Sequence, residues 1–249
     1  MLPARASQRV VIYVVDTIDM ERMQYDTSFD PRLTYVAVVD ATTAEPRDRI
    51  KNELDYRGLL IPGSTLVQNP YRPDEYATIS DAAGKYALDK FVIFSNLCQL
   101  LGARSVRMQS LEETKSGQTK TLNVAADNKV AGSGGSATAM SSAAEKILSQ
   151  KDLMDTFHGA EPDIEAALDL LRRLRLDDDP ILRSLVDSRA AAGNPHKVRQ
   201  ISVDLSQETN GVLSLAAQVT TPTFFKLRVD ASTVKSESAR IKVDYVIEF

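Results

Sequence analysis

The segment ARIKVDYVIEF, residues 239–249, alternates apolar and polar side chains over most of its length. Successive side chains of a β-strand point to opposite faces, so this pattern predicts a strand with one buried and one solvated face. Such half-buried strands are typical of antiparallel sheets, and the buried face must be covered by another layer. The apolar positions are Ile241, Val243, Tyr245, Ile247 and Phe249.

Three further segments before this strand also have strand character. They are residues 197–207, 211–219 and 225–231, and Asn210-Gly211 between the first two favours a tight hairpin turn. The sequence therefore predicts a C-terminal four-stranded antiparallel meander.

Two segments near the other end are dense in β-branched residues. Residues 9–16 (RVVIYVVD) and 33–40 (LTYVAVVD) each end in Asp, and we expect them to be buried neighbours in one sheet. A helix is expected between Pro46 and Gly58, because Pro favours the first turn and Gly the residue after the last.

The clearest helix is residues 80–102. Ser80 or Asp81 can cap its start, and Gly102 can end it. Apolar residues recur at helical spacing, which predicts a central core helix. They are Ala83, Ala87, Phe91, Phe94, Cys98 and Leu101.

The rest of the chain predicts a hairpin followed by helices. Residues 103–127 alternate about the turn KSGQ, and helices are expected over 141–157, 161–176 and 179–193, the last with Asp179 as its cap. The fold class is therefore α+β, with antiparallel sheets packed against three to four helices. We expect an N-terminal part over 1–103 and a C-terminal part over 104–249, which can form one continuous domain.

Composition excludes several kinds of chemistry. Cys98 is the single cysteine and there are two histidines, so neither a disulfide within the chain nor a Cys- or His-rich metal site is expected. The net charge of -4 does not favour a nucleic-acid partner. The apolar run Val10–Val15 is too short for a membrane span or a signal peptide, which favours a cytoplasmic location.

A glycine-rich stretch, GSGGSA, contains Gly132, Gly134 and Gly135. A nucleotide-binding loop would need a lysine at the helix start or a buried parallel strand before it, and the sequence predicts neither. We therefore expect a flexible joint and no cofactor.

Asp16 and Asp40 each end a predicted buried strand. Carboxylates at the ends of neighbouring strands can hold a divalent metal for phosphoryl chemistry, so both are candidate metal ligands. An aspartate is also a common first residue of a turn, which is the simpler interpretation.

A compact basic spot comprises Arg172, Arg173 and Arg175, and three aspartates follow it at 177–179. No aromatic residue lies between the arginines, as a groove for single-stranded nucleic acid would require. The expected role is a solvated helix face with balanced charges.

Residues 104–143 are rich in Ser, Thr, Ala and Gly, a composition that also suits a segment opening onto a membrane. Because no catalytic set of residues emerges, the sequence favours a non-enzymatic interaction or scaffold subunit that acts through a protein partner or self-assembly. The alternatives are a membrane-perturbing effector using 104–143, and a metal-dependent phosphate-handling enzyme using the two aspartates. A membrane is a partner only under the first alternative.

Overall fold

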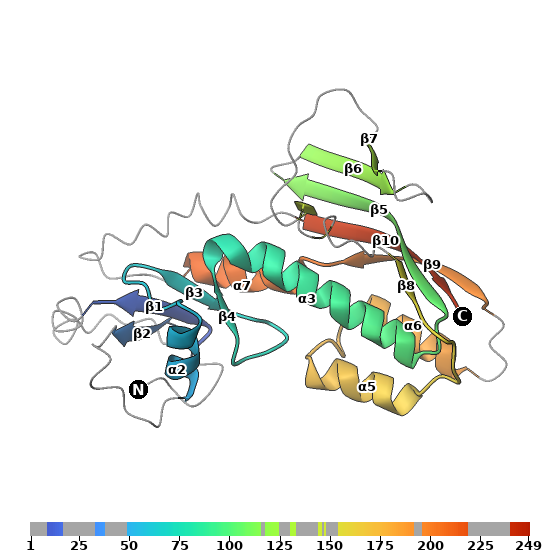
Figure 1. Ribbon diagram of the computed structural model, residues 1–249, viewed down its shortest axis with the longest axis horizontal. Coiled ribbons are helices and arrows are strands. Elements are labelled where there is room, and N and C mark those ends of the chain that lie inside the picture. Colours follow the sequence, from blue (N-terminus) through green and yellow to red (C-terminus); the bar gives the residue numbers. More distant parts are fainter. Residues whose placement is uncertain are drawn as a thin grey trace. The chain divides into compact units, whose positions relative to one another are not determined.

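The computed structural model describes residues 9–16, 33–37, 49–115, 118–124, 130–132, 144–145, 147, 154–191, 196–218 and 240–249. Over these residues the protein has an α+β fold with two sheets, which confirms the predicted class (Figure 1). The chain forms two compact units: residues 1–83 with 209–238, and residues 84–208 with 239–249. The division at residue 103 stays a prediction about independently folding domains.

The first unit contains a four-stranded sheet in the order β2-β1-β3-β4. β1 (Val11–Val15) and β2 (Leu33–Ala37) are neighbours, as predicted, and they run parallel. β3 (Thr65–Gln68) pairs antiparallel with β1, and β4 (Tyr76–Thr78) pairs antiparallel with β3. The sheet is therefore mixed.

One helix, α2 (Arg49–Tyr56), packs against this sheet and confirms the helix expected before Gly58. Gly58 has a φ of 66°, a left-handed conformation that stops the helix and favours glycine. One buried core cluster contains Ile12, Val14, Leu54, Leu66 and Tyr76, with Ile50, Leu59 and Leu60 packed against it.

The central helix α3 (Ile79–Leu100) confirms the helix predicted over 80–102, and the division between the units falls within it. Gly102 ends it with a φ of 79°; a Cβ there would lie 2.2 Å from the carbonyl oxygen of Ala160. Within the second unit, Phe94 of α3 packs on Tyr245, with ring centroids 4.5 Å apart. This contact seats the helix on the second sheet.

The second sheet has the order β7-β6-β5-β10-β9. β5 (Ser105–Lys115) and β6 (Gln118–Val124) form the predicted hairpin, and β7 (Val130–Gly132) extends it. β10 (Arg240–Glu248) confirms the alternating strand and lies between β5 and β9 (Val198–Asp204). Ile241, Val243, Tyr245 and Ile247 are all buried, as the alternation requires.

Two predicted elements differ from the structure. Residues 207–218 form helix α7 (Gln207–Gln218), so the strand expected over 211–219 and the turn at Asn210-Gly211 are wrong. Thr209, Leu213 and Ala216 are buried at helical spacing, and this periodicity outweighs the local turn preference. The strand expected over 225–231 lies outside the described residues.

The second difference concerns the helix expected over 141–157. Ala144, Glu145 and Ile147 are helical, but Met154–Thr156 form strand β8, which pairs with Ser105–Arg107 of β5. β6 pairs with β5 only from Ser110 onward, so β8 completes the same edge of β5 where β6 does not reach. Pairing of these backbone groups explains the strand.

The other two predicted helices are confirmed. α5 (Ile164–Arg173) is capped by Asp163, and α6 (Pro180–Ala190) is capped by Asp179, which accepts hydrogen bonds from the backbone N–H groups of Ile181 and Leu182. Pro180 occupies the first turn of α6, where its missing N–H has no consequence.

Candidate functional site

The edge strand β9 is the candidate functional site. It pairs with β10 along one side over Val198–Asp204, and no strand of the described part of the chain pairs with its other side. An edge strand of this length presents a row of backbone donors and acceptors to which another strand can bind.

Two hydrogen bonds fix which backbone groups of β9 point outward. The carbonyl of Lys197 accepts from the N–H of Phe249 at 2.8 Å, and the N–H of Leu205 donates to the carbonyl of Ile241 at 2.8 Å. Because backbone direction alternates along a strand, the odd-numbered residues of β9 pair with β10. The even-numbered residues Val198, Gln200, Ser202 and Asp204 therefore turn their N–H and C=O groups away from β10.

The side chains of β9 divide in the same way. Val198, Gln200 and Ser202 are exposed, and the Val198 side chain is 56% exposed. Ile201 is half-buried and Val203 is fully buried on the opposite face. The strand contains no proline, the residue that commonly blocks pairing at a sheet edge.

Helix α6 holds one face of β9. The guanidinium of Arg199 donates to the hydroxyl of Ser184 at 3.0 Å, to the carbonyl of Ser184 at 3.3 Å, and to the hydroxyl of Ser188. These bonds fix β9 to the helix without using the outward backbone groups. Helix α6 therefore supports β9 from one face.

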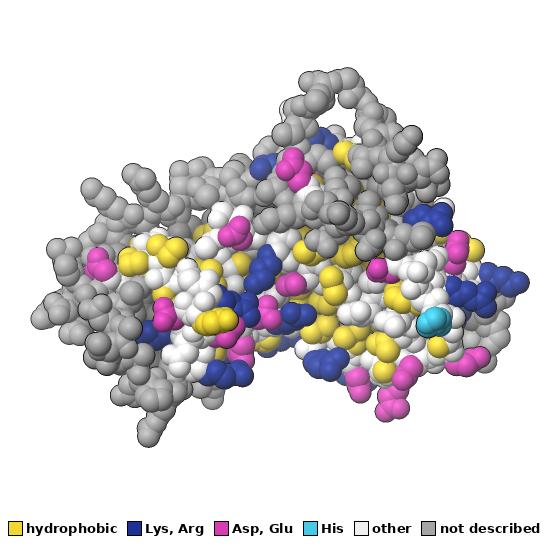
Figure 2. All heavy atoms as spheres, in the orientation of Figure 1, with side chains coloured by type: hydrophobic (Ala, Val, Ile, Leu, Met, Phe, Trp, Pro, Cys, Tyr) yellow, Lys and Arg dark blue, Asp and Glu magenta, His cyan; other side chains and the backbone are white. Residues whose placement is uncertain are grey.

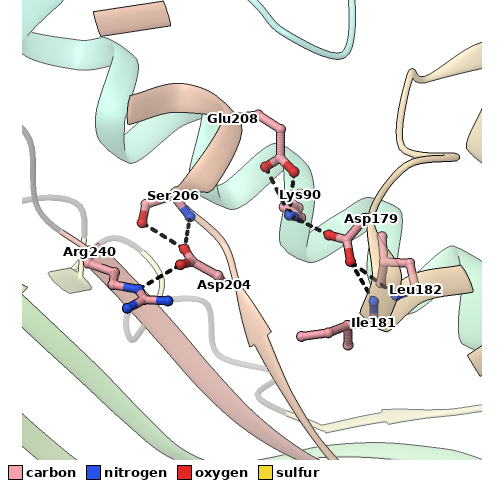
Figure 3. Close-up of polar contacts among 8 residues, drawn as sticks. All are labelled: Lys90, Asp179, Ile181, Leu182, Asp204, Ser206, Glu208 and Arg240. Atoms are coloured by element: carbon pink, nitrogen blue, oxygen red, sulfur yellow. Dashed lines mark hydrogen bonds and ion pairs between the residues drawn. The ribbon is translucent and has the colours of Figure 1, made fainter. Parts of the chain in front are cut away.

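A polar cluster fixes the end of β9 to β10 (Figure 3). The carboxylate of Asp204 accepts from the guanidinium of Arg240 at 2.8 Å, and from the N–H and hydroxyl of Ser206 at 3.0 and 2.9 Å. Burial alone would raise the pKa of Asp204, but the bonds from Arg240 and Ser206 outweigh it and hold that pKa below its usual value. The charged form is therefore favoured in the native state.

A second cluster, of buried charged side chains, is centred on Lys90 of α3 (Figure 3). The ammonium of Lys90 donates to Asp179 at 3.0 Å and to the two carboxylate oxygens of Glu208 at 2.8 and 2.9 Å. Its side chain has no exposed surface, whereas Glu208 is 21% exposed. With every donor engaged and no solvent access, Lys90 is suited to fix α3, α6 and the start of α7, not to act on a substrate.

The buried thiol of Cys98 is unsuited to nucleophilic chemistry. Burial, reinforced by the charge of Asp155, raises its pKa far above the ordinary value, so the reactive thiolate is disfavoured. Its burial agrees with its place on the apolar stripe of the predicted core helix.

The structure describes only one of the two candidate metal ligands. Asp16 is exposed and directly follows β1, and Asp40 lies outside the described residues. The parallel pairing of β1 with β2 places the carboxyl ends of both strands at one edge of the sheet. Among the described residues, no group of three or more His, Cys, Asp or Glu side chains is arranged to hold a metal ion.

The glycine-rich stretch is described only in part. Gly132 is the last residue of β7, and Gly134 and Gly135 lie outside the described residues. The flexible joint stays a prediction.

The basic spot is at the end of α5. Arg172 pairs with Asp169 at 3.0 Å, and both side chains are about two-thirds exposed (64% and 65%). Arg173 and Arg175 are also exposed, and Arg175 follows the helix with a φ of 60°. Of the aspartates that follow, Asp179 is buried and forms an ion pair with Lys90, so its charge does not neutralise the charges of the three arginines. On the face shown in Figure 2, basic and acidic side chains of the described residues are interspersed.

Sequence reasoning missed Lys90 and Glu208 and identified Asp179 only as a cap. A signal for Lys90 was available, since it lies three residues after Ala87 and four before Phe94 on the apolar stripe of α3. A lysine on a buried stripe requires an acidic partner. Nothing in the sequence identifies which carboxylates supply it.

No protein-family model, no curated protein and no solved structure matches this chain. In the described part of the chain, no helix has the length and apolar character that a membrane crossing demands.

Proposed function

We propose that this protein is a non-enzymatic interaction or scaffold subunit that binds a protein partner by adding a strand to the outer edge of β9. The observation that carries the proposal is the outward direction of the backbone groups of Val198, Gln200, Ser202 and Asp204 on a strand that α6 and β10 hold in place. Main-chain hydrogen bonds give affinity in this mode, and the exposed side chains give selectivity.

The described part of the chain supplies no comparable support for catalysis. The buried lysine and the buried thiol face protein atoms, and the interspersed charges of Figure 2 offer no basic surface to nucleic acid on that face. A cytoplasmic location forms part of the proposal, and a chain with one buried cysteine and hence no internal disulfide is compatible with it.

The test is a pull-down of the tagged protein from its own host, with the stoichiometry of retained proteins measured. Gln200→Pro removes an outward N–H that β10 does not use, so it is expected to preserve the sheet and block strand addition. Gln200→Ala changes the side chain and keeps the N–H, which makes it the matched control.

We expect the wild-type protein and Gln200→Ala to retain a partner in a fixed ratio, and Gln200→Pro to lose it at least about tenfold, the effect of a difference of 1.4 kcal/mol in binding free energy. Circular dichroism and thermal melting check that the Pro variant is folded. A folded Gln200→Pro variant that retains the partner at wild-type ratio contradicts the proposal.

A second candidate function is metal-dependent phosphate handling at Asp16 and Asp40. The parallel pairing of β1 and β2 favours it, because strand ends at one sheet edge can bring carboxylates together. The expected result is a rise in melting temperature with Mg²⁺ or Mn²⁺ that Asp16→Asn abolishes. A melting temperature that neither metal changes would remove this candidate.

The membrane-perturbing alternative for 104–143 stays a prediction, and no feature of the described residues specifically favours it. β5 is paired with β10 on one side and with β8 on the other, and both partners lie outside 104–143, so release of this segment would break these two pairings. Dye release from anionic liposomes is the direct test.

A further inference from the structure

We propose that the strand added to β9 is β9 of a second copy of this chain, paired antiparallel across a two-fold axis. The inference rests on the proposed function and names its partner. It follows from the positions of the outward backbone groups, and from the side chains that self-pairing would place opposite one another.

The outward groups of β9 are self-complementary over the whole strand. In an antiparallel pair centred on Ile201, Val198 lies opposite Asp204 of the second copy, and Gln200 lies opposite its Ser202. These are the residues whose N–H and C=O groups point away from β10, so each finds a partner. If the register shifts by two residues in either direction, some of these backbone groups, those at one end of the strand, are left without a partner.

The side chains fit the same register. Gln200 opposite Ser202 pairs an amide with a hydroxyl, and this pair occurs on both sides of the axis. On the other face Ile201 meets Ile201 of the second copy, which covers a side chain that is half-buried in one copy.

Charge also favours this register. Arg199 lies opposite Val203, and Lys197 lies opposite Leu205, so no like charges face each other. A register centred on Asp204 would instead oppose two carboxylates, which is unfavourable. Closed two-fold pairing also leaves no outward edge of β9 to recruit further copies.

The position of Ile201 on the axis gives a specific test. Odd-numbered residues would form non-hydrogen-bonded pairs between copies, with Cα atoms about 4.5 Å apart, within the range that a disulfide spans. Ile201→Cys is therefore expected to form a disulfide-linked dimer under mild oxidation. Ser202→Cys is the matched control. In this register the two Ser202 residues are offset by two positions along the strands, so their Cα atoms are about 8 Å apart, beyond the reach of a disulfide.

The native Cys98 has no exposed surface, so wild-type protein under the same oxidation serves as the background. Light scattering after size exclusion measures the mass of wild type, Gln200→Pro and Gln200→Ala. We expect dimers of wild type and Gln200→Ala, and a folded monomer of Gln200→Pro. A disulfide-linked dimer is expected for Ile201→Cys in large excess over Ser202→Cys.

A monomeric wild-type protein overturns self-pairing, as does a dimer that survives Gln200→Pro or a lack of Ile201→Cys cross-linking. The proposed function fails separately, when a folded Gln200→Pro variant keeps every partner that the wild type retains. A monomeric wild type whose host partner is lost in Gln200→Pro therefore rejects the second copy and supports strand addition by another protein.

Discussion

The ammonium of Lys90 bonds to both carboxylate oxygens of Glu208, although the lysine side chain has no exposed surface. The same ammonium also reaches Asp179, the cap of α6. Three helices are therefore joined through one nitrogen atom. A buried cluster of this kind specifies one arrangement of its elements, because any other arrangement leaves a charge without a partner.

Lys90→Met is expected to lower the free energy of unfolding by about 3–5 kcal/mol, since two carboxylates lose their shared cation. The matched control is Arg172→Met, which breaks an exposed pair and is expected to change stability by less than about 1 kcal/mol. Urea denaturation of both variants measures the difference. Equal stabilities of the two variants would contradict a structural role for the cluster.

Substitutions of Asp179 separate its two roles. Asp179→Asn keeps an oxygen for the N–H groups of Ile181 and Leu182 and removes the charge that faces Lys90. Asp179→Ala removes both, and is expected to be less stable than the Asn variant by about 1 kcal/mol, the usual contribution of a cap. Thermal or chemical melting of the two variants provides the test, and an Ala variant as stable as Asn would show that the cap contributes nothing.

Tyr245→Phe is expected to stabilise the protein. The Tyr245 hydroxyl is buried and finds no hydrogen-bond partner among the described residues, while its ring packs on Phe94. Removal of an unsatisfied buried hydroxyl should raise the free energy of unfolding by about 1 kcal/mol. The control is Tyr76→Phe: its hydroxyl accepts from Arg9 at 3.0 Å and donates to the Arg9 carbonyl at 3.1 Å, so loss of stability is expected. A destabilised Tyr245→Phe would show that the hydroxyl has a favourable role.

The same tyrosine predicts a dependence on alkaline pH. Burial, with the nearby Cys98 and Asp155, raises the pKa of Tyr245 well above its ordinary value. The unfolded chain then loses this proton near pH 10 while the native state keeps it, so stability falls as pH rises above about 10. Tyr245→Phe should reduce the slope there and leave the slope at neutral pH unchanged. Identical alkaline slopes in urea melts of the two proteins would count against this explanation.

Asp204 predicts the opposite dependence at acid pH. Its pKa is lowered in the native state, so its stabilising contribution is complete above the unfolded value of about 3.9 and is lost as pH falls through the native value. Arg240→Met should therefore be less stable than wild type by about 0.5–1 kcal/mol at neutral pH. The difference should shrink below about pH 4 in urea melts, and a constant difference across that range would exclude Asp204 as its source.

Periodic segments could be predicted from the sequence, because burial alone determines their pattern. The alternation of β10, the stripe of α3 and the Asp179-Pro180 start of α6 all lie where expected. α7 could not be predicted from its Asn-Gly pair, since burial of Leu213 and Ala216 decided its conformation. Local turn preferences contribute less than the burial of a helical face.

The candidate site was harder to predict than the fold. The sequence predicted a strand over residues 197–207 with its neighbour over 211–219, whereas the structure pairs β9 with β10. Which groups of β9 point outward depends on its register with β10, and the Lys90 cluster depends on residues up to 118 positions apart. Such pairings arise only from the folded arrangement, so a single sequence does not reveal them.

The place of β10 between β5 and β9 has a consequence for biosynthesis. Ser105 of β5 pairs with Glu248 of β10, so a ribosome must add more than a hundred residues to β5 before β10 can pair with it. During that interval β5 has an unsatisfied side that other nascent chains can bind. Closing so long a loop also slows folding. The protein should therefore depend on chaperones during synthesis more strongly than its native stability suggests, and its yield should fall as expression temperature and rate increase.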